Sequence, residues 1–121
     1  MPLMIALVMA AASAPAQSQS DLNGQTANDL MKADAAMNVQ YRATMAAMRK
    51  MDEYDAPDAK SGPSYRQALL TSQRAWLTFR DAECVVEGNS FRGGSGQNMA
   101  VASCKATLTR QRTAQLKAAA Q

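Results

Sequence analysis

Three long segments of the chain place apolar residues at intervals of three and four, which is the repeat of one helix face. These segments cover residues 27–51, 65–87 and 98–119. No segment alternates apolar and polar residues as a half-buried strand would. The pattern therefore predicts three amphipathic helices and no sheet.

Each predicted helix has an apolar stripe that we expect to face the core. The first stripe comprises Leu30, Ala33, Met37, Tyr41, Met45 and Met48. The second comprises Tyr65, Leu69, Ser72, Trp76, Phe79 and Glu83, with Gln73, Arg80 and Cys84 at its border. The third is thinner and comprises Val101, Cys104, Leu108, Gln111 and Leu116.

Short polar links separate the helices. Residues 52–63 contain two prolines and a glycine, and residues 88–97 are rich in glycine. Three helices with short links predict an all-α fold, a three-helix antiparallel bundle in one domain. We expect Thr26 or Asn28 to cap the first helix, so that the domain spans residues 26–119. The polar residues 17–25 would then form a flexible N-terminal arm.

The N-terminus has the features of a secretory signal peptide. An apolar run over residues 3–12 is followed by Ser13-Ala14-Pro15-Ala16, which predicts cleavage after Ala16. The run is too short to span a membrane. The alternative is a buried N-terminal helix. The short length of the run and the small residues that follow it favour a signal peptide over such a helix. We therefore expect residues 1–16 to be removed and the protein to be periplasmic or secreted.

Two cysteines, Cys84 and Cys104, flank the glycine-rich link. In an exported protein such a pair is expected to form a disulfide, here joining the second and third helices. In the chain-entropy model, a bridge closing a loop of this length stabilises the fold by roughly 3 kcal/mol.

Histidine is absent from the chain. Its absence excludes Ser-His-Asp and Cys-His catalysis and imidazole metal ligands. The cysteine spacing also excludes a Cys-x-x-Cys redox or zinc motif. We therefore expect no enzyme activity and no cofactor. Met45, Met48 and Met51 could bind Cu(I) in an exported protein, but methionine more often fills gaps in a core that is poor in aromatic residues.

The charges are unevenly distributed along the chain, whose net charge is +3. An acidic linker follows the first helix and comprises Asp52, Glu53, Tyr54, Asp55 and Asp58. Residues 88–121 contain five bases and no acid. The linker is a candidate contact for a basic protein, and the basic third helix is a candidate contact for anionic glycan or a membrane surface. Without interleaved aromatic residues, the basic helix does not indicate nucleic-acid binding.

The only tryptophan, Trp76, lies one helical turn before Arg80. We expect Trp76 to be part of the core rather than an exposed binding anchor. A buried arginine needs a partner, and Asp34 on the first helix is the best candidate, with Tyr41 as a neighbour. Such a pair is more often structural than part of a ligand site.

Several segments resemble the LprI-like family of small exported bacterial domains. They are residues 73–84 (QRAWLTFRDAEC), the glycine-rich loop at 93–96, Cys104 and residues 109–116. Residues 33–41 (ADAAMNVQY) match more weakly. Many members have a further cysteine pair near the first helix, which this chain lacks. The resemblance covers about residues 26–116 and supports the helical fold.

The family is named for a lipoprotein described as a lysozyme inhibitor, so the resemblance implies lysozyme or another envelope protein as the partner. Common lysozymes are basic, and a chain of net charge +3 gains no long-range attraction to them. Of the candidate surfaces, only the acidic linker has the opposite charge. The other hypothesis is a structural or regulatory envelope module that uses its basic third helix.

Overall fold

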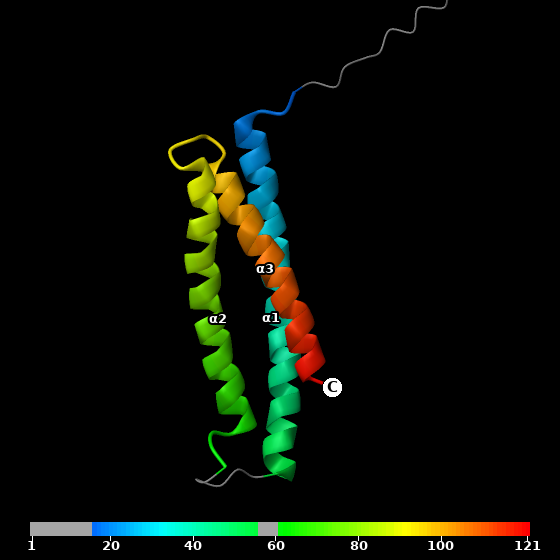
Figure 1. Ribbon diagram of the computed structural model, residues 1–121. Helices are drawn as coiled ribbons and strands as arrows, with labels where there is room; N and C mark the ends of the chain where they lie inside the picture. The colour runs from blue at the N-terminus through cyan, green and yellow to red at the C-terminus, as the bar shows by residue number, and fades with distance from the viewer. Residues whose placement is uncertain (1–15, 56–60) are drawn as a thin grey trace, which may run out of the picture.

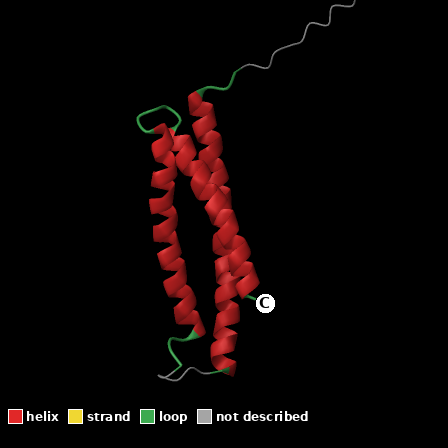
Figure 2. Ribbon diagram, viewed as in Figure 1, coloured by secondary structure: helices red, strands yellow, loops and turns green. Residues whose placement is uncertain are grey.

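The computed structural model describes residues 16–55 and 61–121. Helix α1 covers Gln19–Tyr54, α2 covers Tyr65–Gly88 and α3 covers Gln97–Ala119, with a short 3-10 turn, η1, at Asn89–Phe91 (Figure 1). The described residues contain no strand (Figure 2). The all-α prediction is confirmed. Residues 1–15 of the expected signal peptide, and Asp58, lie outside the described residues.

Helices α1 and α3 run in the same direction and α2 runs against both (Figure 1). Helix α3 packs most extensively against α1, and the contact between α1 and α2 is the smallest of the three. Because α1 has 36 residues and α3 only 23, α3 ends before the far end of α1. The molecule therefore has a three-helix part and, beyond the end of α3, a two-helix part.

Helix α1 begins earlier than the sequence pattern predicted. Ser18 caps the helix: its hydroxyl accepts a hydrogen bond from the Asp21 N–H, and Asp21 reaches back to the Ser18 N–H. This reciprocal capping box satisfies two N–H groups that a helix start leaves open. The predicted start at residue 27 is therefore wrong, and residues 19–25, assigned to a flexible arm, are helical. Gly24 lowers helix propensity but does not interrupt the helix.

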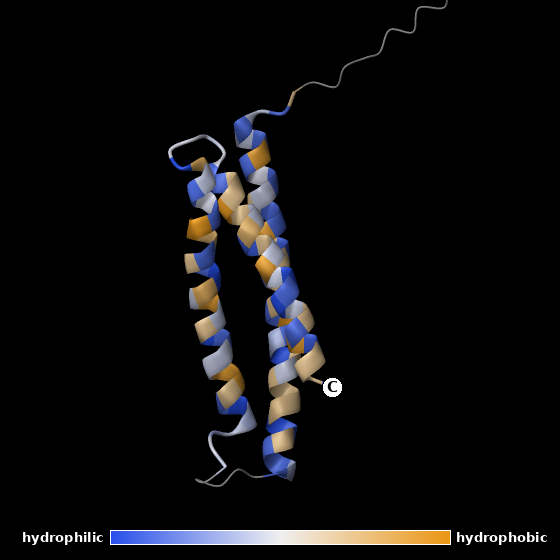
Figure 3. Cartoon of the chain, in the orientation of Figure 1, coloured by the Kyte–Doolittle hydropathy of each residue, from blue (hydrophilic) through white to orange (hydrophobic). Residues whose placement is uncertain are grey.

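The core is small and rich in methionine. It is formed by Met37, Met45, Leu69 and Leu116. Partly buried residues pack around it, namely Tyr41, Met48, Leu70, Trp76 and Leu77. Polar and apolar residues are interspersed along all three helices (Figure 3). Within the described residues, no helix is long and apolar enough to span a membrane.

The buried face of α2 differs from the predicted one. Phe79, predicted to be in the core, is 53% exposed, whereas Gln73, Arg80 and Cys84, predicted to border the core, are buried. The reason is tertiary: Cys84 has to face α3, and Arg80 has to reach α1. These two contacts rotate α2 about its axis, although Phe79 is the more hydrophobic residue.

A disulfide joins α2 and α3 as predicted. Cys84 and Cys104 have an S–S distance of 2.09 Å and a Cα–Cα distance of 5.5 Å. The two helices also lie close together at Gly88, where a Cβ atom would lie 2.5 Å from the Cγ2 atom of Val101. A larger residue at position 88 would push the helices apart next to the disulfide.

Candidate functional site

Arg80 joins all three helices. Its Nη1 atom lies 2.7 Å from Asp34 Oδ1 of α1 and donates a hydrogen bond of 3.1 Å to Thr109 Oγ1 of α3. Its Nε atom lies 3.0 Å from Asp81 Oδ1, which is also 3.5 Å from Lys105 Nζ. Two cations and two carboxylates thus balance one another, as the burial of Arg80 requires.

Trp76 lies between two guanidinium groups. The Cζ atom of Arg80 is 5.5 Å from the centre of the indole ring, and that of Arg112 is 5.8 Å away. Both distances are in the range of cation–π attraction. Trp76 is partly buried against the core, and Tyr41 packs against the same core. The structure thus places Trp76, Arg80 and Asp34 in one cluster, with Tyr41 further along α1.

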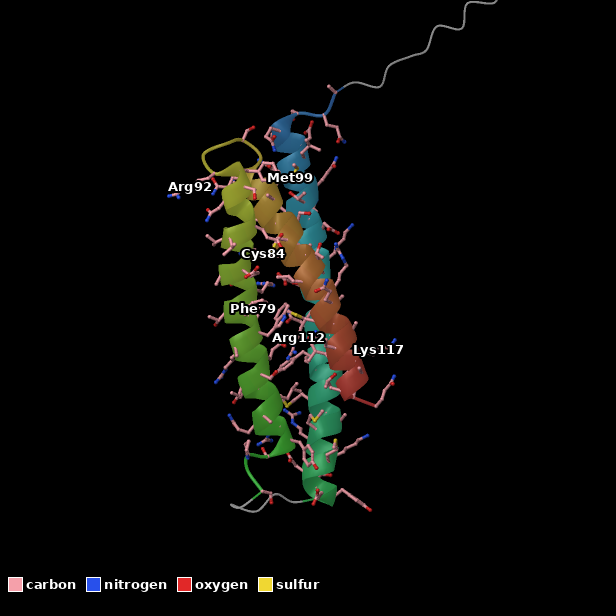
Figure 4. All side chains as sticks on the ribbon, viewed as in Figure 1. Phe79, Cys84, Arg92, Met99, Arg112 and Lys117 are labelled. Carbon is pink, nitrogen blue, oxygen red and sulfur yellow. A yellow bond between two sulfur atoms is a disulfide. The ribbon has the colours of Figure 1, made fainter. Side chains whose placement is uncertain are left out.

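Arg112 extends this cluster and was missed as a site residue at the sequence level. Its Nε atom donates to Gln73 Oε1 at 2.9 Å, and its Nη2 atom donates to Ser72 Oγ at 3.0 Å. The Gln73 amide in turn contacts Met37 Sδ at 3.5 Å. Partial burial lowers the pKa of Arg112, but an arginine remains charged at neutral pH. Figure 4 shows Arg112 between α2 and the α1–α3 pair.

The polar groups of this cluster are satisfied within the protein. In the described residues, every buried side-chain nitrogen and oxygen atom has a hydrogen-bond partner. Residues 16–55 and 61–121 contain no group of three or more acids or cysteines arranged to hold a metal ion. The arrangement resembles a fold-stabilising network more than a ligand site.

The acidic segment occupies the tip of the molecule, where α1 ends and α2 begins. Asp52, Glu53 and Tyr54 form the last turn of α1 rather than a linker. The Asp52 carboxylate accepts hydrogen bonds from the N–H groups of Tyr65 and Arg66, at 2.8 and 3.2 Å. Asp52 thereby caps the start of α2. This contact holds Asp52 in place at the end of α1, and α1 continues past its predicted end at residue 51.

Of the remaining tip residues, some form hydrogen bonds within the protein and others are exposed. The Tyr65 hydroxyl donates a hydrogen bond of 3.2 Å to Asp55 Oδ2. This bond and the negative charge of Asp55 raise the pKa of Tyr65 above its usual value. Glu53 is exposed, and Tyr54 is 96% exposed. Glu53 and Tyr54 are therefore the acidic-segment side chains most available to a partner.

Two other sequence-level candidates are placed less favourably. On α3, Lys105 approaches Asp81, Arg112 belongs to the cluster around Trp76, and Arg110 pairs with Asp29 at 3.0 Å. Lys105 and Arg110 are thus paired with acids, and Arg112 is held by neutral hydrogen-bond partners. The methionine triplet is also divided, because Met45 lies in the core whereas Met51 is 41% exposed.

The comparisons with known proteins identify the family of this chain by its sequence. No solved structure matches the chain. An uncharacterised protein from Rhizobium meliloti is 44% identical over 104 residues, which are 84% of this chain and 73% of that protein. The model of the family described as lysozyme inhibitor LprI matches residues 10–116. The match includes the Trp76–Arg80 cluster, both cysteines and the tip, and the chain belongs to the LprI lysozyme inhibitor family.

Proposed function

We propose that this chain is an exported, non-enzymatic protein that binds a lysozyme and inhibits it through the tip of the α1–α2 hairpin. The family description supplies the kind of partner. The observation that carries the choice of contact is Tyr54, which is 96% exposed at the end of a 36-residue helix. A tyrosine this exposed contributes little to the fold and is free to be buried by a partner.

The shape of the tip suits a concave target. A lysozyme holds its sugar chain in a cleft between two catalytic carboxyl groups, and a projecting helix end can enter such a cleft and exclude the substrate. Tyrosine is enriched at the energetically dominant positions of interfaces because it offers a large rigid surface and one polar group. Tyr54 would therefore be the central contact.

The charges of the tip suit a basic enzyme at short range. Glu53 and Asp55 flank Tyr54 and have the sign opposite to that of a basic lysozyme. Favourable charge pairs at the edge of an interface mainly raise the association rate. Asp52 holds the start of α2 against the end of α1, so these two helix ends are fixed before binding and lose less entropy on contact.

A lysis assay with bacterial cell walls tests this proposal. The variant Glu53→Gln/Tyr54→Ala removes the two freest tip side chains and leaves the Asp52 cap in place. We expect inhibition to weaken by roughly tenfold or more, as for the loss of a central interface tyrosine. The matched control is Phe79→Ala/Glu87→Gln, which removes an exposed aromatic residue and an exposed acid from α2.

The control should inhibit as strongly as the wild type. Equal inhibition by the tip variant would place the contact elsewhere on the molecule. A wild-type protein that inhibits no lysozyme in a panel of enzymes would refute the proposed function itself.

A further inference from the structure

A groove lies between α1 and α2, beside the last turn of α3 and beyond it, and three arginines border it. Its volume is about 490 Å³. We call it the arginine groove and define it by Tyr41, Arg42, Met45, Arg49, Arg66 and Leu70. Met45 and Leu70 form an apolar floor, because Met45 is buried and Leu70 is partly buried. The three arginines are exposed and form the rim.

The arginine groove opens on the side of α1 away from α3. Thr44 faces α3, because its hydroxyl donates a hydrogen bond of 2.8 Å to the Leu116 carbonyl oxygen. Arg42 and Arg49 are two and five residues from Thr44, which places them about 140–160° around the helix from it. Arg42 and Arg49 are two turns apart and so share one face. Helix α3 therefore leaves the arginine groove open to a partner.

The rim arginines are unpaired, in contrast to Arg80 and Arg112 around Trp76. None of the Arg42, Arg49 and Arg66 side chains forms an ion pair or hydrogen bond with any residue in 16–55 or 61–121. Asp52 and Glu53 share a neighbouring hollow with Arg49 and Arg66. The Asp52 carboxylate is already occupied by the α2 N–H groups. The groove thus keeps an excess of positive charge.

We propose that the arginine groove binds an acidic, partly apolar helical segment of a protein partner. Carboxylates of such a segment would pair with the guanidinium groups, whose planar donors match a carboxylate in a two-pronged contact. Its apolar side chains would cover Met45 and Leu70, as in other helix-in-groove complexes. The composition favours a protein over a membrane or glycan surface, because arginine, tyrosine and methionine are the residues enriched in protein interfaces.

This site is separate from the tip contact proposed above. A positive groove does not attract a basic lysozyme, so the arginine groove would serve a second, acidic partner. Its position on the flank of the hairpin leaves the tip free. The two proposals can therefore fail independently.

The test uses dye-labelled helical peptides that have two glutamates at the spacing of Arg42 and Arg49, with leucine, methionine or phenylalanine between them. Fluorescence anisotropy measures their binding to the mature protein. The variant Arg42→Gln/Arg49→Gln/Arg66→Gln should weaken binding of the best peptide by roughly tenfold or more. Peptides with glutamine in place of glutamate should bind the wild type as weakly as the glutamate peptide binds the groove variant.

The matched control, Arg74→Gln/Arg92→Gln/Lys117→Gln, removes the same charge from exposed positions outside the groove. Arg92 and Lys117 point away from the bundle (Figure 4). This control should bind the peptide as the wild type does. Circular dichroism should give all three proteins the same helix content, and the groove variant should inhibit lysozyme as the wild type does.

Three outcomes would overturn the proposal. Equal weakening by the groove and control variants would mean that only overall charge matters. Tighter binding to vesicles rich in anionic lipid than to any peptide, lost in the groove variant, would identify a membrane surface as the ligand. Failure of every acidic peptide to bind the wild type would mean that the groove has no such partner.

Discussion

The two parts of the bundle use charged residues in opposite ways. In the three-helix part, Arg80 and Arg112 are enclosed and paired, and they surround Trp76. Toward and within the two-helix part, the exposed Arg42, Arg49 and Arg66 have no such partners among the described residues. The comparison separates stability from recognition: a paired, buried charge specifies the packing, whereas an unpaired, exposed charge remains available for binding.

The difference follows from where α3 ends. Where α3 is present, it contributes Thr109, Lys105 and Arg112, which complete the polar clusters of α1 and α2. Past its last turn, which lies beside Thr44, the two remaining helices cannot enclose a long side chain between them. We therefore expect changes in the three-helix part to alter stability and changes in the two-helix part to alter binding alone.

The largest effect is expected at Trp76. Trp76→Ala would leave a cavity beside the core and remove both cation–π contacts, at a cost of about 3 kcal/mol in the free energy of unfolding. Urea denaturation followed by circular dichroism measures this cost. A variant as stable as the wild type would show that the three-helix part does not depend on this cluster.

Reduction of the disulfide should have an effect of similar size. Reduction frees a long loop of the unfolded chain, which costs roughly 3 kcal/mol in the chain-entropy model. The melting temperature should therefore fall on addition of a reductant. Mass spectrometry of the non-reduced protein should show Cys84 linked to Cys104. An unchanged melting temperature after full reduction would contradict this role for the bridge.

Asp34→Asn should cost less than either change. The Asp34 side chain is 38% exposed, so solvent screens part of its attraction to Arg80, and we expect a loss of about 1–2 kcal/mol. Asp29→Asn is the comparison, because its pair with Arg110 is more than half exposed on both sides. That variant should lose less than about 0.5 kcal/mol. Equal losses of unfolding free energy in the two variants would mean that the burial of Arg80 does not strengthen its pair with Asp34.

The smallest effect on stability is expected in the two-helix part. Replacing the three rim arginines of the groove with glutamine should change the free energy of unfolding by less than about 0.5 kcal/mol, because glutamine keeps the helix propensity and no described partner is lost. Chemical denaturation measures it. Breaking a buried network typically costs about 2 kcal/mol or more in the free energy of unfolding. A loss of that size would show that this part also relies on its charges for stability.

The sequence pattern was most reliable for α1 and least reliable for α2. On α1 the predicted stripe contains the buried residues Ala33, Met37 and Met45 and misses only the buried Thr44. On α2 the apolar residues are spread around the helix, and Phe79, Val85 and Val86 are all more than half exposed. A hydrophobic pattern fixes the orientation of a helix only when the apolar residues share one face. On α2, contacts with the other helices determine the orientation.

By itself, the sequence determined three helices, one disulfide and the family motif around Trp76, because each depends on residue types and short spacings. Only the tertiary structure decided which charges are paired. Arg80 and Asp34 are 46 residues apart, and Arg112 and Gln73 are 39 apart, far beyond the reach of helical periodicity. Arg42, Arg49 and Arg66 stay uncovered because α3 packs on another side of α1 and ends at Ala119. The available binding surface is thus set by the relative lengths and packing of the helices.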